Sequence, residues 1–361
     1  MQTGDGLLAR VRVAGGRLTP DQLIALARLA QAHGNGLVEV SARGNLQVRG
    51  LTQETASIFA HGVEEEAEIE RGLVVQTPPL AGDDPAELAD PWPVAAAIRI
   101  AAASLNSRLG PKVTVVVDGA GQIGLGNLNT DIRLIATGPK NWIMSIAGRP
   151  AEPVASHDEV SVTLRVLRQI AALGPSARAT DLDGGAAKVT ADATRPIGHF
   201  TLKTSHAMGI ALPFGSAQAT ALIALAHAAK MHGVSEFRLA PHHTLLAISA
   251  NATFAAEAKE LGFITEAADP RQRISACIGS EGCASGHVPA RVTAARLAPY
   301  LPSGRHLHVS GCSKGCAHPR ASDVTLVGSA EGYGLVIGGK AGDTPRTVLQ
   351  AKDLAGVLGR E

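Results

Sequence analysis

The sequence has few aromatic residues and no surplus of either charge. Aromatics make up 3% of the 361 residues, and 33 basic side chains face 32 acidic ones, for a formal net charge of +1. A general nucleic-acid binder usually carries a basic excess with interleaved aromatics, so this composition argues against that class. No uncharged apolar run reaches the roughly 18 residues of a membrane span, and the polar start 1–6 shows no apolar leader. We expect neither nucleic acid nor a membrane as partner.

Cysteine is also scarce, because the whole chain contains four. They form two glycine-flanked pairs, Cys277-x5-Cys283 and Cys312-x3-Cys316. Four thiolates in two pairs can hold one iron–sulfur cluster, and glycines allow backbone amides to approach and donate to sulfur. Two disulfides, a structural zinc site and four unrelated buried thiols are the other interpretations. The cluster explains best why all four cysteines gather in two short stretches, and with reduced thiols it fits a cytoplasmic protein.

The chain is long enough for several cores, since 361 residues with 45% hydrophobic content predict roughly two to four domains. Its first segment alternates as a strand over 6–13, a helix, and strands over 37–41 and 46–49. Thr19 as N-cap and Pro20 at the next position predict where the helix begins. The order strand–helix–strand–strand is half of a ferredoxin-like α+β layer.

This unit returns 199 residues later, because the run 23–27 matches 222–226 and the strand 37–41 matches 236–240. A fainter repeat relates 131–135 to 323–327. We therefore predict a duplicated A–B–A′–B′ chain in which the last unit alone carries cysteines. Two copies of a unit form a cleft between them, and ligands prefer such interfaces. The expected segments are A over 1–75, B over 76–195, A′ over 196–265 and B′ over 266–361, with linkers rich in Pro, Gly and Asp over 77–93 and 174–199.

One glycine motif is set aside. Residues 119–124 fit Gly-x-Gly-x-x-Gly after a predicted strand over 113–117, but a dinucleotide site also needs a helix directly after the glycines. Residues 125–129 begin no helix, and Asp118-Gly119 is typical of a hairpin turn. We expect electrons to come from an external donor or reductase.

Cations lie on or beside the predicted strands of A and B, at Arg43, Arg49, Lys112 and Arg133. Arginine forks bind carboxylates bidentately and lysine adds a point charge, although for any one of these residues alone an ordinary surface charge is the favoured interpretation. Lys314 differs because it stands between two cysteines. A cation there would lower the net negative charge of a cluster and raise its potential.

Histidines flank the second cysteine pair, at His306, His308 and His318, and a further pair occupies 242–243. Imidazoles of this kind can bind a mononuclear iron. No His-x-x-His pattern selects among them, so a structural role for each is the simpler interpretation.

The cysteine spacing, the duplicated plan and the stretch 41–50 (SARGNLQVRG) resemble the sulfite/nitrite reductase hemoprotein superfamily over almost the whole chain. The resemblance implies an α+β fold in which two ferredoxin-like half-domains and two reductase-type α/β domains surround a central cleft. It also implies a [4Fe-4S] cluster on Cys277, Cys283, Cys312 and Cys316, and cations that grip the carboxylates of a tetrapyrrole.

Carried over by position, Arg43 and Gln47 match the superfamily's tetrapyrrole-side arginine and the glutamine four positions on, and Lys112 matches a strand lysine. There are departures, because Thr114 stands where a second catalytic lysine is expected and 73–75 lack an expected arginine. A small anionic substrate needs those cations, so their loss weakens the case for sulfite or nitrite reduction. No catalytic residue is assigned. The expected substrate-binding set is Arg43, Gln47, Arg49, Lys112, Arg133 and Lys314.

The short length and the stretch 309–319 most resemble those members that act in aerobic cobalamin synthesis. There the substrate implied is precorrin-3A, with dioxygen as co-substrate, hydroxylation at C20 and closure of a γ-lactone. A mononuclear non-haem iron beside the cluster is implied as well. The alternatives are a small sirohaem-dependent sulfite or nitrite reductase, and a non-catalytic scaffold that binds a cluster or zinc.

Overall fold

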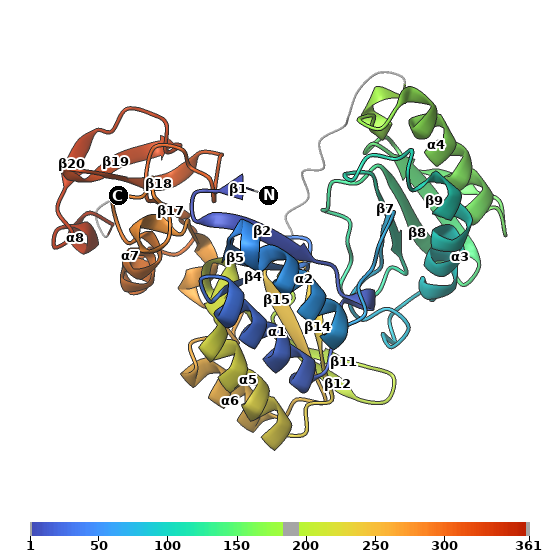
Figure 1. The fold of residues 1–361 in the computed structure, drawn as a ribbon, viewed down its shortest axis with the longest axis horizontal. Coiled ribbons are helices and arrows are strands. Elements are labelled where there is room, and N and C mark those ends of the chain that lie inside the picture. The colour runs from blue at the N-terminus through green and yellow to red at the C-terminus, as the bar shows by residue number, and fades with distance from the viewer. Residues whose placement is uncertain (1, 183–194, 359–361) are drawn as a thin grey trace.

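The structure is a computed structural model that describes residues 2–182 and 195–358, so part of the linker expected over 174–199 lies outside the described residues. The described residues form four sheets of five strands each. Two sheets make a central unit, and the other two lie on opposite sides of it (Figure 1). No helix within the described ranges is both long and apolar enough to cross a bilayer.

The first central sheet is built mainly by the N-terminal segment, in the order β1-β2-β5-β4-β13. Thr19 caps its first helix as predicted, since its hydroxyl accepts from the Gln22 backbone amide while the Thr19 backbone amide donates to Gln22 Oε1. The elements are β1 (Gln2–Thr3), β2 (Gly6–Val11), α1 (Pro20–His33), β4 (Leu37–Val40), β5 (Leu46–Leu51), α2 (Gln53–Glu66) and β13 (Ser216–Gln218).

The second central sheet repeats this plan in the order β11-β12-β15-β14-β3. The two sheets exchange one short strand each, because β13 pairs with β4 and β3 pairs with β14. Helices α1 and α5 pack together, and one apolar core contains residues of both copies, among them Leu23 and Leu222. The elements are β3 (Arg17–Leu18), β11 (Gly198–Thr201), β12 (His206–Ala211), α5 (Ala219–Met231), β14 (Glu236–Ala240), β15 (Thr244–Ile248) and α6 (Ala252–Glu260).

The two flanking sheets also share one topology. In each, three strands run parallel and two more continue antiparallel. One sheet contains β6 (Val74–Gln76), β7 (Thr114–Asp118), β8 (Ile132–Gly138), β9 (Asn141–Ile146) and β10 (Glu152–Val154), with α3 (Trp92–Ala102) and α4 (Glu159–Leu173). The other contains β16 (Ile274–Ala276), β17 (Leu307–Ser310), β18 (Ser322–Ser329), β19 (Gly332–Gly339) and β20 (Thr347–Leu349), with α7 (Ala290–Leu297) and α8 (Leu354–Leu358). The predicted α+β fold with duplicated units is confirmed.

The hairpin predicted at Asp118-Gly119 is wrong, because β7 and β8 pair in parallel and a loop over 119–131 joins them. Asp118 organises this loop: its carboxylate accepts from the amides of Ala120 at 2.9 Å and Leu125 at 2.7 Å. The Asp-Gly signal therefore marks a turn of the chain without marking a hairpin. No helix follows the glycines in this described segment, which agrees with setting aside the dinucleotide motif.

Candidate functional site

The four cysteines line one cavity of about 570 Å³ between the first central sheet and the C-terminal flanking sheet. Cys277 directly follows β16, and Cys312 lies two residues beyond β17. These strands pair in parallel, so their carboxyl ends meet at one edge and bring the two cysteine stretches together. All four are free thiols, so the disulfide interpretation has no support in the structure.

Glycines surround these sulfurs closely. The Gly311 amide donates to Cys277 Sγ at 3.0 Å, and a Cβ added to Gly4 would stand 2.8 Å from Cys283 Sγ. Four thiols line one cavity, a backbone amide donates to one of the sulfurs, and glycines without side chains let the backbone come close to them. This arrangement fits an iron–sulfur cluster. Across 2–182 and 195–358, no three His, Cys, Asp or Glu side chains are arranged to hold a single metal ion.

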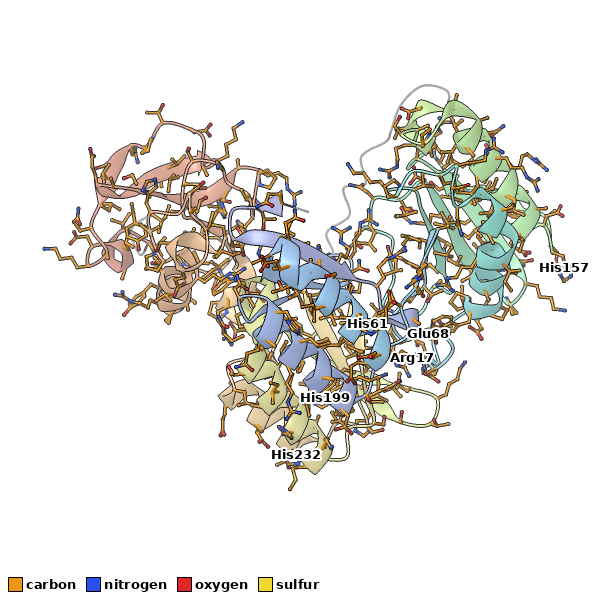
Figure 2. All side chains as sticks on the ribbon, in the orientation of Figure 1. Arg17, His61, Glu68, His157, His199 and His232 are labelled. Atoms are coloured by element: carbon orange, nitrogen blue, oxygen red, sulfur yellow. The ribbon has the colours of Figure 1, made fainter. Side chains whose placement is uncertain are left out.

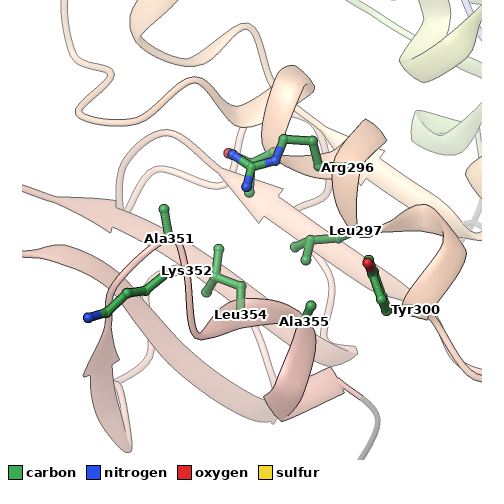
Figure 3. A pocket seen from close by; sticks show the side chains of 8 residues that line it. Arg296, Leu297, Tyr300, Ala351, Lys352, Leu354 and Ala355 are labelled. Atoms are coloured by element: carbon green, nitrogen blue, oxygen red, sulfur yellow. The ribbon is translucent and has the colours of Figure 1, made fainter.

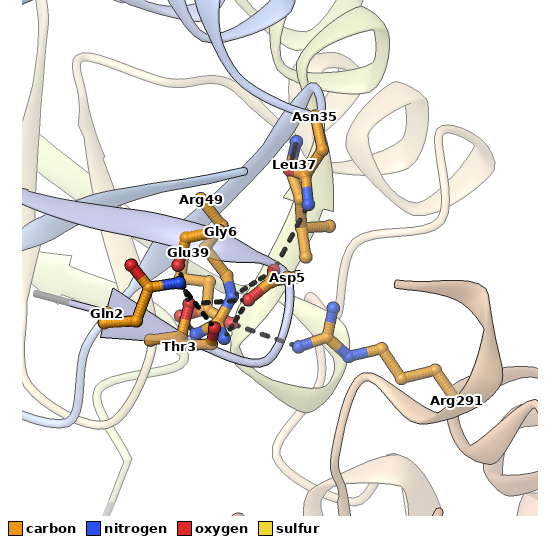
Figure 4. Close-up of polar contacts among 9 residues, drawn as sticks. All are labelled: Gln2, Thr3, Asp5, Gly6, Asn35, Leu37, Glu39, Arg49 and Arg291. Atoms are coloured by element: carbon orange, nitrogen blue, oxygen red, sulfur yellow. Dashed lines mark hydrogen bonds and ion pairs between the residues drawn. The ribbon is translucent and has the colours of Figure 1, made fainter. Parts of the chain in front are cut away.

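A partly buried charge network lies at one wall of the cavity, and Figure 4 shows its polar contacts. Arg49 on β5 donates two bonds of 2.8 Å to the Asp5 carboxylate and lies 3.4 Å from Glu39 on β4. Burial lowers the pKa of Arg49, but its bonds to Asp5 and the charge of Glu39 outweigh burial and raise that pKa overall. Glu39 also accepts from Arg291 on α7 at 3.1 Å. The network therefore joins the first sheet to the cysteine-bearing domain.

Three of the six predicted substrate residues line this cavity: Gln47, Arg49 and Lys314. Gln47 faces Arg10, whose guanidinium lies 3.2 and 3.3 Å from the Gln47 amide oxygen when that amide is turned toward it. Lys314 Nζ donates to Ser285 Oγ at 3.0 Å. These three residues give the cavity polar and cationic side chains, with Gln47 and Arg49 on the first sheet and Lys314 between two of the cysteines.

The other three predicted residues lie outside the cavity lining. Arg43 bonds the Asn129 carbonyl and lies 3.4 Å from Gln76 Oε1, so it ties the first sheet to the loop before β8. Arg133 is buried and bonds the Leu128 carbonyl within that loop. Lys112 is exposed in the turn before β7. Burial lowers the pKa of Arg43 and of Arg133.

Sequence reasoning missed two arginines of the cavity, Arg195 and Arg291. The Arg195 side chain has no hydrogen bond or ion pair among the residues that the structure describes, although it is partly buried and burial lowers its pKa. Arg291 is held by Glu39, and its Nε is buried without a described partner. Neither residue belongs to a motif, and the tertiary fold alone brings them to the cysteines.

The three histidines beside the second cysteine pair gather in space. The His306 and His318 rings lie 4.7 Å apart between centroids, and those of His308 and His318 lie 5.7 Å apart. Burial lowers the pKa of His306 and of His308 to about 4, so both are neutral near pH 7. His61, His157 and His232 lie elsewhere on the molecule (Figure 2), and none of them lines the cavity.

A second cavity of about 410 Å³ lies between α7 and the chain around α8 (Figure 3). Its walls come from apolar and basic side chains, including Arg296, Tyr300 and Lys352. It contains no thiol, carboxylate or imidazole. The candidate site is the cavity that brings all four thiols together with carboxylate and cationic side chains.

Comparisons with known proteins identify the fold and the family of the chain. The profile of the nitrite/sulfite reductase ferredoxin-like half domain matches residues 1–60. The structure of the Mycobacterium tuberculosis NirA protein has a TM-score of 0.65 and 19% identity, covering 98% of this chain and 79% of that one, which shows a shared fold. A precorrin-3B synthase from Sinorhizobium sp is 36% identical over 392 aligned positions, covering 100% of this chain and 85% of that protein. With this similarity along its full length, the chain belongs to the precorrin-3B synthase family, built on the nitrite/sulfite reductase fold.

Proposed function

We propose that this chain is an oxidoreductase that converts precorrin-3A to precorrin-3B in aerobic cobalamin synthesis. In detail, we propose a monooxygenase reaction in which one atom of dioxygen becomes the C20 hydroxyl oxygen and a ring-A acetate closes to a γ-lactone. The other oxygen atom leaves as water, reduced by two electrons from an external donor. The observation that carries the proposal is the 36% identity to a precorrin-3B synthase over the full chain. The NirA protein, at 19% identity, supports the fold and leaves the reaction open.

We assign Cys277, Cys283, Cys312 and Cys316 as the ligands of a [4Fe-4S] cluster, because all four line one cavity. When bound, such a cluster passes single electrons to the site, and an external donor or reductase must supply them. The chain's part is to hold the sulfurs, to shield them by close glycine backbone, and to present the Gly311 amide to Cys277. We also propose a mononuclear non-haem iron. No protein ligands are assigned to it.

The substrate carries many carboxylates, so cationic residues of the cavity are the natural contacts. Gln47, Arg49 and Lys314 stay in the proposed substrate-binding set, and Arg195 joins them. The Arg195 side chain has no ion-pair partner among the described residues, so it can take a carboxylate without breaking an ion pair that the structure describes. Arg49, by contrast, is held by Asp5 and keeps its place in the cavity wall. Three predicted residues lie outside this lining: Arg43, Lys112 and Arg133. Their role in substrate binding stays a prediction from the sequence.

A sirohaem-dependent reductase is the alternative, and bound pigment separates the two functions. Sirohaem as a resident cofactor gives a strong Soret band, whereas a synthase that takes its tetrapyrrole as substrate shows only cluster absorption after purification. The test is the absorption spectrum of anaerobically purified protein, followed by aerobic consumption of precorrin-3A with a reductant. Tightly bound sirohaem with no consumption of precorrin-3A would overturn the proposed function.

A further inference from the structure

The two copies of the central unit differ at one tight turn. The turns are η1 (Ala14–Gly16) and η4 (Pro213–Gly215), which precede the exchanged strands β3 and β13. Gly15 has φ 60° in the first turn, and Phe214 has φ 55° in the second. Glycine adopts this left-handed conformation freely, whereas a bulky residue there is strained. The second copy therefore keeps a phenylalanine where the backbone favours glycine.

A second residue that differs between the two copies lies beside Phe214. His243 has φ 66° where the first copy has Gly44 with φ 75°. Its ring fits because Gly215 has no side chain, since a Cβ there would stand 2.6 Å from His243 Nδ1. His243 Nδ1 bonds the Val40 carbonyl at 2.6 Å, which fixes the ring against the first sheet. Phe214 and His243 both line the cysteine cavity.

The surroundings of the two turns explain the difference. Near Gly15 the place next to the backbone is filled by Trp92, whose ring lies 3.0 Å from where a Cβ would be. Phe214 instead projects its own ring at the junction with the cysteine-bearing domain, where it packs with Cys277 against that domain's core. Among the described residues, Phe214 is the one Phe, Tyr or Trp that lines the cavity. In a chain with 3% aromatics this placement is specific.

We propose that Phe214 is a substrate-contact residue, whose ring supports one face of the tetrapyrrole macrocycle beside Cys277. The inference rests on the proposed function, because it takes a tetrapyrrole as the occupant of the cavity. Strained backbone persists where the surrounding structure enforces it and is concentrated at ligand sites. A flat aromatic ring gives a conjugated macrocycle an apolar contact that the arginines and Lys314 of this cavity cannot give. The turn thus contributes to recognition of the ring system, and the cations recognise its carboxylates.

A purely structural role makes a different prediction. If Phe214 only docks the central unit onto the cysteine-bearing domain, its loss lowers stability and cluster content together and leaves substrate affinity of the intact protein unchanged. Leu349 is a matched control, since it packs against the same core and is absent from the cavity lining. Phe214→Gly restores the residue of the first copy and relieves the backbone. Phe214→Leu keeps apolar bulk without a ring, and Phe214→Tyr keeps the ring.

The experiment measures anaerobic binding of precorrin-3A to the cluster-loaded full chain, with iron and labile sulfide per chain and the thermal midpoint recorded for each variant. We expect Phe214→Gly and Phe214→Leu to raise the dissociation constant about tenfold or more at unchanged cluster content. Phe214→Tyr should bind like the wild type, and Leu349→Ala should lose thermal stability alone. If Phe214→Gly fails to fold, Phe214→Leu decides.

Two results overturn the inference. One is wild-type affinity in the Phe214→Gly and Phe214→Leu variants. The other is a loss of binding that only matches an equal loss of cluster. In both cases the proposed function stands, because the wild type binds precorrin-3A. A wild type that does not bind precorrin-3A overturns the proposed function and this inference together.

Discussion

Glu39 and Arg291 are 252 positions apart and form an ion pair of 3.1 Å at the wall of the cysteine cavity. Glu39 also lies 3.4 Å from Arg49, so one carboxylate serves two guanidinium groups. Burial lowers the pKa of Arg291, and the charges of Glu39 and of the nearby Cys277 act in the opposite direction. This contact links the first sheet to the domain that carries the cysteines.

Removing the shared charge should destabilise the protein. Glu39 and Arg291 expose 16% and 17% of their side chains. Glu39→Gln therefore leaves the largely buried Arg291 without its carboxylate, and Arg49 keeps only Asp5. We expect the free energy of unfolding to fall by about 2 kcal/mol, measured by chemical denaturation with the m-value checked for a single transition. Glu64→Gln is the control, because the Arg71–Glu64 pair is 74% and 50% exposed and should change stability by less than about 0.5 kcal/mol. Equal effects of the two variants would contradict the account.

Cys312→Ser should abolish the cluster. A serine oxygen is a poor substitute for a thiolate at iron, and the other three cysteines cannot complete the ligand set. The measurement is iron and labile sulfide per chain after anaerobic reconstitution, with Ser313→Ala as the neighbouring control. Stoichiometric zinc without iron or sulfide in the wild type would show that the cysteines bind zinc instead of a cluster.

Arg195→Gln should weaken binding of precorrin-3A more than any stability change explains. Its guanidinium lines the cavity, so its removal breaks no hydrogen bond or ion pair among the described residues. Loss of one charge-assisted carboxylate contact predicts a dissociation constant about tenfold to a hundredfold higher in anaerobic titration. Lys140→Gln, an exposed cation in the turn between β8 and β9, is the control. Unchanged affinity in Arg195→Gln would remove this residue from the substrate site.

Glu87 predicts a pH dependence away from the cavity. Burial raises its pKa from 4.5 to about 7, the Gly82 amide and Lys203 oppose the shift, and Asp84 and Asp90 add to it. Between these values the folded state keeps a proton that the unfolded state has released, so stability falls as pH rises from about 4.5 to about 7.

Glu87→Gln removes this titration and keeps an oxygen for the Gly82 amide, which donates to Glu87 at 2.9 Å in the wild type. The thermal midpoint of the variant minus that of the wild type should therefore be larger at pH 8 than at pH 5. A difference between variant and wild type that does not change with pH would contradict the assignment.

The duplicated fold and the cysteine stretches could be predicted because their signals are local. Residues 23–27 of α1 match residues 222–226 of α5 in sequence, and Thr19 marks where α1 begins. The exchange of β3 and β13 could not be predicted, since strands of two and three residues carry no periodicity.

The residues of the cavity wall could likewise be predicted only in part from the sequence. Gln47, Arg49 and Lys314 were found through a motif or through the neighbouring cysteines, and they line the cavity. Arg195 and Arg291 reach it only through packing between domains, which leaves no mark in nearby sequence. The parallel pairing of β7 with β8 likewise overrode the turn chemistry of Asp118-Gly119.

The most direct test of the central claim is the fate of labelled dioxygen. The cluster-loaded chain is incubated with precorrin-3A, a reductant and heavy-isotope dioxygen, and the product is analysed by mass. The account predicts precorrin-3B that carries one labelled oxygen atom, with no product from the Cys312→Ser variant. Turnover without label in the product, or reduction of sulfite or nitrite in place of any change to precorrin-3A, would contradict it.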